Sequence, residues 1–209
     1  LDMTGSIDAG DRAFTVDADT SRLEGELIAG SFVLVGSGNT AVLDGVITAS
    51  DAAGITIDDS LRVVDALTLQ VTDSTADIVL GRAADQLADG QAPFYLASNA
   101  DTDLATLRLE LAGGDAVFHS VIDEGTGTSP TTGHLEGLEI DGANDVTFNE
   151  VLEVAGDVTI NATGNVNFAK GVTLLEGGSL TITGAQDVCF ADGLITLQAN
   201  AGAAGGVTI

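Results

Sequence analysis

The most constraining feature of this sequence is a set of short apolar–polar–apolar segments that recurs through its C-terminal third. The segments fall into three columns: 138–140, 158–160 and 180–182; then 146–148, 166–168 and 188–190; then 151–154, 172–175 and 194–197. Successive members of each column follow at a nearly constant step, and a fourth set opens at 207–209. A period shared by three columns indicates a stacked repeat structure.

The spacing within each segment predicts the type of repeat. In a strand, alternate side chains point to opposite faces, so the two outer residues of each segment face the same side. Three short strands per coil of about 20 to 22 residues predict an all-β fold, a right-handed parallel β-helix whose coils stack about 4.8 Å apart. A β-sandwich is the alternative, but a sandwich does not require the same residue type to return at a fixed period.

Stacked coils place like residues above one another, and two such ladders are expected. The second column supplies an aromatic ladder inside the coil, formed by Phe148, Phe168 and Phe190. The turn before it supplies an Asx ladder, formed by Asp145, Asn165 and Asp187. In this order the neutral residue separates the two acids by about 10 Å, which weakens their repulsion.

Residues 1–209 are interpreted as a single β-helix segment with two interruptions. Residues 1–80 contain strand-like pieces at uneven spacing, which predicts irregular coils. Residues 81–106 break the pattern and are expected to form an excursion, with a short outer helix at 82–88. Coil strands resume in 107–123, a flexible Gly- and Thr-rich loop follows in 124–134, and regular coils occupy 135–209.

The charge balance argues against several classes of partner. The chain has 32 acidic and 6 basic residues, which gives a net charge of −26. Nucleic acid and anionic membrane surfaces are not expected as partners, because phosphate binding needs clustered Lys and Arg. Membrane insertion is not expected either, because no run of about 18 apolar residues exists. The acidic composition suits a secreted surface, a calcium-rich medium or a high-salt habitat, and it does not choose among them.

One acidic turn is a candidate metal site. Asn99, Asp101 and Asp103 place oxygen donors at alternate positions, as the first half of a calcium loop does. The glycine that such a loop carries at its sixth position is Leu104 here. A solvated acidic turn is therefore the alternative to a Ca²⁺ site.

Catalysis is not expected. Glycoside hydrolysis needs two carboxylates across the scissile bond, which this chain could supply from many positions. A lyase also needs clustered positive groups, but the basic residues are widely spaced: Arg12, Arg22, Arg62, Arg82, Arg108 and Lys170. A strongly negative surface would also repel polyuronate substrates.

The histidines and the cysteine are expected to have ordinary roles. His119 and His134 have no partner at ligand spacing and are expected on the surface or in loops. Cys189 is the middle residue of its segment, so it should point outward in the column of Thr147 and Asn167 as a free thiol. A single cysteine excludes an internal disulfide framework.

Two stretches of the regular coils, GDVTINA at 156–162 and GSLTITG at 178–184, carry a family resemblance. They resemble the β-helical repeats of filamentous-haemagglutinin-type proteins and are similar to repeats in the giant acidic surface adhesins of bacteria. The match covers about 135–209, roughly a third of the chain. The resemblance implies secretion, a rod-like shape, and adhesion or matrix building without catalysis.

These observations predict a structural or adhesive segment of a long secreted fibre at the cell surface or in an extracellular biofilm matrix. It would act as a stiff spacer, and its expected partners are further copies or neighbouring repeats, glycans and cell surfaces. Open strand edges favour end-to-end self-assembly, with calcium as a candidate bridge between acidic surfaces. No cap or signal peptide is evident, so we expect a piece of a longer protein. The alternative is a glycan-binding or glycan-cleaving β-helix.

Overall fold

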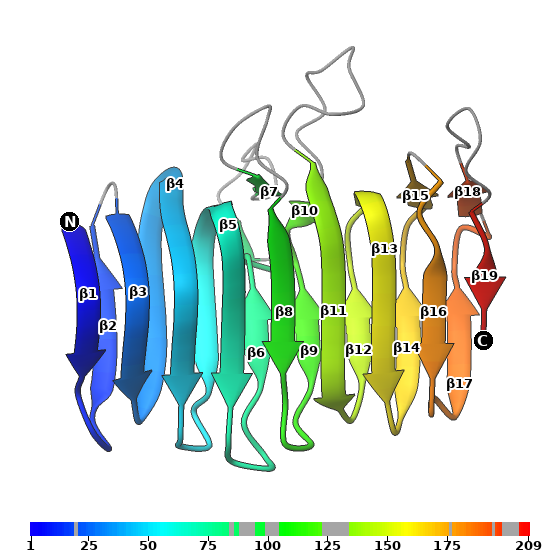
Figure 1. Ribbon diagram of the computed structural model, residues 1–209. Helices are drawn as coiled ribbons and strands as arrows, with labels where there is room; N and C mark the ends of the chain where they lie inside the picture. Colours follow the sequence, from blue (N-terminus) through cyan, green and yellow to red (C-terminus); the bar gives the residue numbers. More distant parts are fainter. Residues whose placement is uncertain are drawn as a thin grey trace.

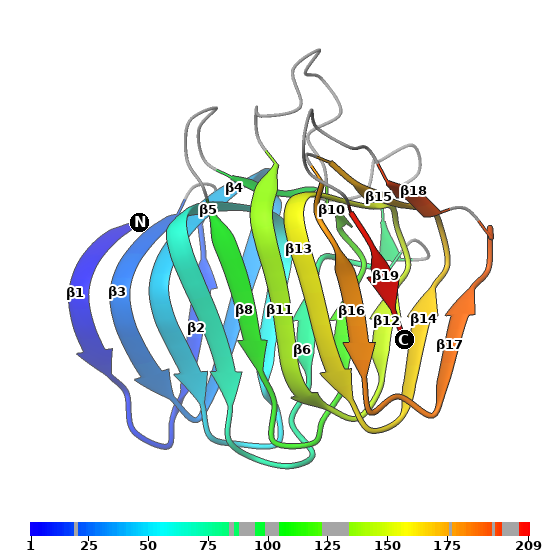
Figure 2. The same ribbon diagram turned by 45° about the vertical axis from the view of Figure 1, so that its right-hand side comes forward.

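A computed structural model describes residues 1–18, 21–83, 86–87, 95–98, 105–122, 134–175, 177–193, 195–197 and 205–209. In it the chain forms an all-β, right-handed solenoid of parallel strands (Figures 1 and 2). The predicted parallel β-helix is therefore confirmed. The solenoid has three faces, named 1 to 3 after the three columns of the repeat.

Face 1 is the broad sheet at the front of Figure 1. Its strands are β1 (Asp2–Asp8), β3 (Ser21–Ala29), β4 (Ser31–Ala49), β5 (Ile55–Val71), β8 (Thr106–Glu110), β11 (Leu135–Ala143), β13 (Leu152–Ala162), β16 (Leu180–Thr183) and β19 (Val207–Thr208). The long strands β4 and β5 run through all three faces and bend at the corners.

Faces 2 and 3 close the coil behind face 1. Face 2 holds the first parts of β4 and β5 together with β2 (Ala13–Asp17), β6 (Ile78–Leu80), β9 (Ala116–Phe118), β12 (Val146–Phe148), β14 (Asn165–Phe168) and β17 (Asp187–Phe190). Face 3 holds β7 (Tyr95–Ser98), β10 (Val121–Ile122), β15 (Val172–Leu174) and β18 (Ile195–Leu197), with parts of β1, β3, β4, β5, β11 and β13.

On face 1 the first coils keep nearly the same step as the last ones. Ser6 pairs with Glu26, and Glu26 pairs with Val46, so both coils are as long as the one that joins Leu138 to Val158. Val46 pairs with Thr68, a slightly longer step that equals the one from Val158 to Leu180. On face 2 the steps are uneven, because Phe14 pairs with Phe32, 18 residues on, and Phe32 pairs with Ile55, 23 residues on. The coils that the sequence predicts to be irregular in 1–80 are therefore uneven on face 2 and nearly even on face 1.

A glycine corner explains why the regularity of face 1 is hidden in the sequence. Gly5, Gly25 and Gly45 are register partners with φ values of 103°, 118° and 89°. A Cβ on Gly25 would lie 2.3 Å from the Gly5 carbonyl oxygen, and one on Gly45 would lie 2.1 Å from that of Gly25. The corner therefore requires glycine, which favours positive φ, whereas the next two coils carry Leu67 and Leu107 in the same column. The apolar period is lost where glycine replaces leucine.

Part of the predicted excursion belongs to the coil. Within 81–106, β7 pairs with both β5 and β10, and Leu96 is buried in the core. The three consecutive buried residues of β7 do not alternate, so the strand has no period-2 signature. The predicted helix at 82–88 lies partly outside the described residues, and the predicted loop at 124–134 lies outside them except for His134.

The aromatic residues of face 2 stack inside the solenoid. Phe148, Phe168 and Phe190 form a ladder that extends one coil further, to Phe118. Along it, successive ring centroids are 4.5, 5.0 and 4.8 Å apart, and the planes differ by 15°, 2° and 2°. A second stack of Phe14 on Phe32, with centroids 6.2 Å apart, lies two residues away along the strands of the same face.

The first and third residues of each face-2 strand point inward, and where one of them is large the other is smaller. In the first coils the large residue stands first, as in Phe14 with Val16 and Phe32 with Leu34. In later coils it stands third, as in Ala116 with Phe118 and Val146 with Phe148. Because protein interiors are close-packed, each coil must fill nearly the same cross-section as the coils that it touches.

Phe168→Ala is expected to lower the free energy of unfolding by about 3–5 kcal/mol, because it leaves a cavity between two stacked rings. Phe190→Ala should cost clearly less, because Phe190 is only half-buried and stacks on a ring from one side. Urea unfolding followed by circular dichroism measures both. The control is Cys189→Ala on the outer face, which should change stability by about 0.5 kcal/mol or less. Equal losses for the two phenylalanines would contradict the ladder's role.

Candidate functional site

The Asx ladder lies at the start of the face-2 strands and is longer than the sequence predicts. Its members each come directly before a register-paired residue of face 2, and they are Asp77, Asp115, Asp145, Asn165 and Asp187. Asp77 Oδ1 accepts the Asp115 backbone N–H at 2.8 Å, and Asp115 Oδ1 accepts that of Asp145 at 3.0 Å. Asp145 Oδ1 accepts the Asn165 backbone N–H at 2.5 Å. Each of these carboxylates therefore binds the backbone of the next coil.

The structure corrects the physical reason offered for this ladder. The sequence predicts that a neutral residue separates the acids, but Asp77, Asp115 and Asp145 follow one another in successive coils. Backbone N–H donors, rather than alternation with a neutral residue, offset the repulsion, because hydrogen bonds to a charged acceptor are strong. The ladder therefore joins successive coils.

The calcium candidate Asn99, Asp101 and Asp103 lies outside the described residues. Glu110 stands at the twelfth position counted from Asn99, where a calcium loop carries a bidentate glutamate. Its carboxylate is instead bonded to neighbouring side chains on face 1. Within the part of the chain that the structure describes, no three His, Cys, Asp or Glu side chains gather as a metal site.

A polar network crosses three coils of face 1. Gln70 Nε2 donates to Glu110 Oε2 at 2.6 Å, and Arg108 Nε donates to Glu110 Oε1 at 2.7 Å. Arg108 also donates through Nη1 to Glu139 Oε2 at 3.0 Å. The Arg108 side chain is 42% exposed, so these ion pairs contribute little to stability.

Two shallow hollows flank this network. The first, of about 530 Å³, is lined by Thr68, Thr106, Arg108, Glu139, Asp157 and Thr159 among others. The second, of about 440 Å³, is lined by Gln70, Thr72, Glu110 and Asp141 among others. Hydroxyl, amide and carboxylate groups therefore face solvent together on face 1.

Asp59 is the buried acid of the described core, with 1% of its surface exposed. It lies at the corner between faces 2 and 3, so close to Gly36 that a Cβ there would be 1.9 Å from Asp59 Oδ2. Burial raises the pKa of Asp59 to about 6, and the Asp58 charge adds to the effect. The Ser60 N–H, which Asp59 Oδ1 accepts at 2.8 Å, and the Arg82 charge oppose it.

Arg82 holds the outer carboxylate of this corner. Its Nε and Nη2 donate to Asp58 Oδ1 and Oδ2 at 2.8 and 2.6 Å. Two consecutive acids in a strand point to opposite faces, so one of the pair Asp58–Asp59 must face inward. That signal was available in the sequence and would have identified the buried acid.

The two histidines lie directly beside strands, and the cysteine lies within β17. His119 is half-buried, with Nδ1 3.1 Å from Asn149 Nδ2. His134 lies directly before β11, as the loop alternative predicts, but its side chain is only 7% exposed, with Nε2 3.6 Å from Glu153 Oε1. Cys189 is exposed and in register with Asn167, which confirms its outward orientation.

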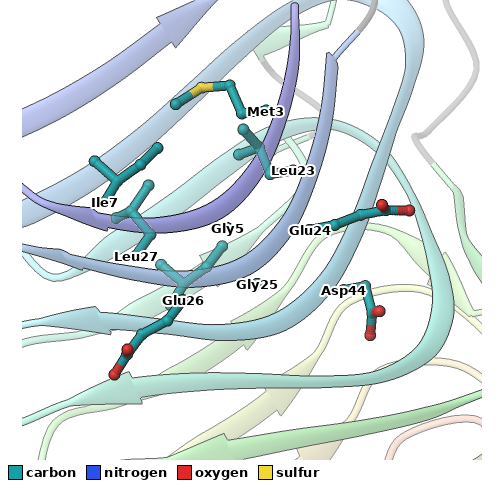
Figure 3. Close-up of a pocket in the computed structure, with 10 residues that line it drawn as sticks. Met3, Gly5, Ile7, Leu23, Glu24, Gly25, Glu26, Leu27 and Asp44 are labelled. Atoms are coloured by element: carbon teal, nitrogen blue, oxygen red, sulfur yellow. The ribbon is translucent and has the colours of Figure 1, made fainter.

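The N-terminal end of the solenoid opens onto the core. Figure 3 shows Met3, Ile7, Leu23 and Leu27 gathered on one side of the strands around a small hollow, while the carboxylate of Glu24 points away from it. The large apolar side chains exposed at the two ends are Leu1 at 53%, Leu197 at 40%, Val207 at 39% and Ile209 at 69%. Among the described strands, the outer edges of β1, β2, β17, β18 and β19 have no strand partner.

Comparison with known proteins does not assign this chain to a family. No family model, no curated protein and no solved structure matches it. No helix in the described ranges is long and apolar enough to cross a membrane.

Asp59→Asn is expected to raise the free energy of unfolding at pH 7.5 by about 2–3 kcal/mol. This is the free energy that corresponds to a pKa raised from 3.8 to about 6. The pKa of Asp59 is higher in the folded state than in the unfolded state, so the ionised carboxylate destabilises the fold. This destabilisation is absent at low pH and grows as the pH rises from about 4 to 6. The gain should therefore vanish near pH 4. Denaturant unfolding at several pH values measures it.

The matched control is Asp192→Asn, which removes one negative charge from an exposed turn. It should change stability little at either pH. A gain at pH 7.5 equal to that of Asp59→Asn would assign the effect to net charge rather than to burial.

Proposed function

We propose that this chain is a stiff structural segment of an extracellular fibre or adhesin that joins further coils at its ends. The observation that carries this proposal is the contrast between its ends and its sides. Apolar side chains and unpaired parallel strand edges are open at both ends of the described solenoid, whereas the core is closed along its length. Such edges favour addition of another strand.

The core supports the role of a spacer. A single hydrophobic cluster runs from Val16 in the first coil to Ile182 near the last. Each coil is hydrogen-bonded to the next on three faces, so bending would strain several strand pairs at once. Such a rod would hold its two ends at a fixed distance from each other.

The surface charge supports an extracellular setting and a role for divalent cations. The net charge is −26, and ion pairs to acids in the described residues engage Arg22, Arg82, Arg108 and Lys170 among the basic side chains. Because the net charge is strongly negative, two rods would repel each other along their sides, and calcium would screen and bridge them. The resemblance of residues 135–209 to bacterial surface-fibre repeats favours secretion and attachment at a cell surface.

Electron microscopy of the purified chain, first with millimolar calcium and then with a chelator, tests the proposal. Filaments or end-to-end rods are expected with calcium, and they should fall apart without it. Ile7→Lys places a charge on the inward side of the open β1 edge and should abolish end-to-end growth. Ser6→Lys, on the outward side of the same strand, is the control. Dispersed short particles under both conditions would refute self-assembly of this chain.

A second candidate function is the binding or cleavage of a neutral glycan on face 1. The two hollows beside Arg108 favour it, because hydroxyl, amide and carboxylate groups gather there. Calorimetry with neutral oligosaccharides should then show saturable binding that Glu139→Gln weakens and Asp192→Asn leaves unchanged. Absence of binding, and of depolymerisation in the same mixtures, would exclude this function.

A further inference from the structure

The larger hollow of face 1 is a groove that follows the solenoid axis across β5, β8, β11 and β13, which are neighbours in Figure 1. Register pairing arranges its walls in two rows of outward side chains, two residues apart along each strand, or about 7 Å. The rows are Ala66, Thr106, Gly137 and Asp157, and Thr68, Arg108, Glu139 and Thr159. Face 1 continues on both sides, with β4 before β5 and β16 after β13, so the groove lies inside the solenoid and not at an end.

Gly137 lies in the middle of this groove, although the fold does not require glycine there. The backbone at Gly137 does not have a positive φ. A Cβ on Gly137 would lie 3.6 Å from the Asp157 carbonyl oxygen and 3.7 Å from Thr106 Cγ2, which are ordinary contacts. By contrast, a Cβ on Gly156 would lie 2.0 Å from the Glu136 carbonyl oxygen. Glycine inside a strand often marks a place where a ligand approaches the backbone closely, and packing does not explain Gly137.

From this geometry we propose that the groove binds an extended, neutral, β-linked glycan chain that lies along the solenoid axis. The four coils present the same two rows at steps of about 4.8 Å. One sugar of an extended chain advances by a similar distance, so successive sugars would meet equivalent positions in successive coils. The inference rests on the second candidate function, glycan binding on face 1, and assigns the shape and direction of the ligand.

The charges of the groove favour a neutral ligand. Arg108 Nε donates to Glu110 Oε1 at 2.7 Å, and Arg108 Nη1 donates to Glu139 Oε2 at 3.0 Å. These two carboxylates offset the guanidinium charge, so the groove has no excess of positive charge for an acidic sugar. Asp157 and the net charge of −26 would repel such a sugar. A polycation would meet the Arg108 guanidinium in the middle of the groove.

The walls offer both kinds of contact that a sugar makes. The guanidinium of Arg108 is a hydrogen-bond donor, the carboxylates are acceptors, and the threonine hydroxyls are both, as sugar hydroxyls are. The side chains of Arg108 and Glu139 are 42% and 46% exposed, so a ligand can reach them. The methyl groups of Ala66 and of the threonines can pack against the C–H groups of the sugar rings.

A series of oligosaccharide lengths tests the groove on the unaltered chain. Calorimetry would use cello-, xylo- and manno-oligosaccharides of two to six sugars, which are extended β-linked chains. In at least one series, affinity should rise about tenfold or more from the disaccharide to the tetrasaccharide, because four coils line the groove, and should then level off. Malto-oligosaccharides, whose α-linked chain coils, should bind about tenfold more weakly at equal length.

Gly137→Val places a branched side chain in the middle of the groove and should weaken tetrasaccharide binding about tenfold or more. Gly137→Ala should leave urea unfolding nearly unchanged, because a Cβ fits at this position. The matched control is Thr56→Val, outward on face 2 in the column of Val33 and Val79, which should leave binding unchanged. Circular dichroism verifies that each variant is folded.

The outcomes separate this inference from the function on which it rests. Glycan binding that does not depend on chain length, or that folded Gly137→Val leaves unchanged, would overturn the axial groove and leave glycan binding on face 1 standing. Absence of binding in all of the series would overturn both. Filament formation in the electron microscope is a separate result and bears on neither.

Discussion

Every coil of this protein must fit the coil beneath it on three faces at once, and the rest of the structure depends on that requirement. Parallel strands in register place like positions above one another, so each inward side chain packs mainly against the same position in the next coil. A single coil has too little apolar surface to offset the entropy of ordering its backbone. The coils therefore stabilise one another, and the fold extends along one axis only.

The sequence predicted those features that recur at a fixed step. Phe148, Phe168 and Phe190 return once per coil of nearly constant length, and their stack follows directly from that period. Phe118 belongs to the same stack but precedes Phe148 by a longer step, because the intervening connection is longer. A periodicity test cannot find a partner across an insertion of unknown length.

Features that depend on contacts between coils were harder to predict. The bend at Gly25 requires the absence of a side chain, which leaves no apolar signal in the sequence. His134 is covered and lies beside Glu153, a neighbour that only the coil geometry supplies. The sequence contains the acids of the Asx ladder, but their hydrogen bonds to the next coil's backbone became visible only in three dimensions.

The size compensation on face 2 has a consequence for how such a chain can change in length. Ile55 with Ile57 and Ile78 with Leu80 form a transition between coils with phenylalanine first and coils with phenylalanine third. A coil copied next to its parent meets neighbours with the same arrangement. A coil moved across the transition would press its ring against the small residues of one column and leave a void between the rings of the other. Tandem duplication within a block can therefore lengthen this solenoid, whereas free exchange of coils between the two blocks would disrupt it.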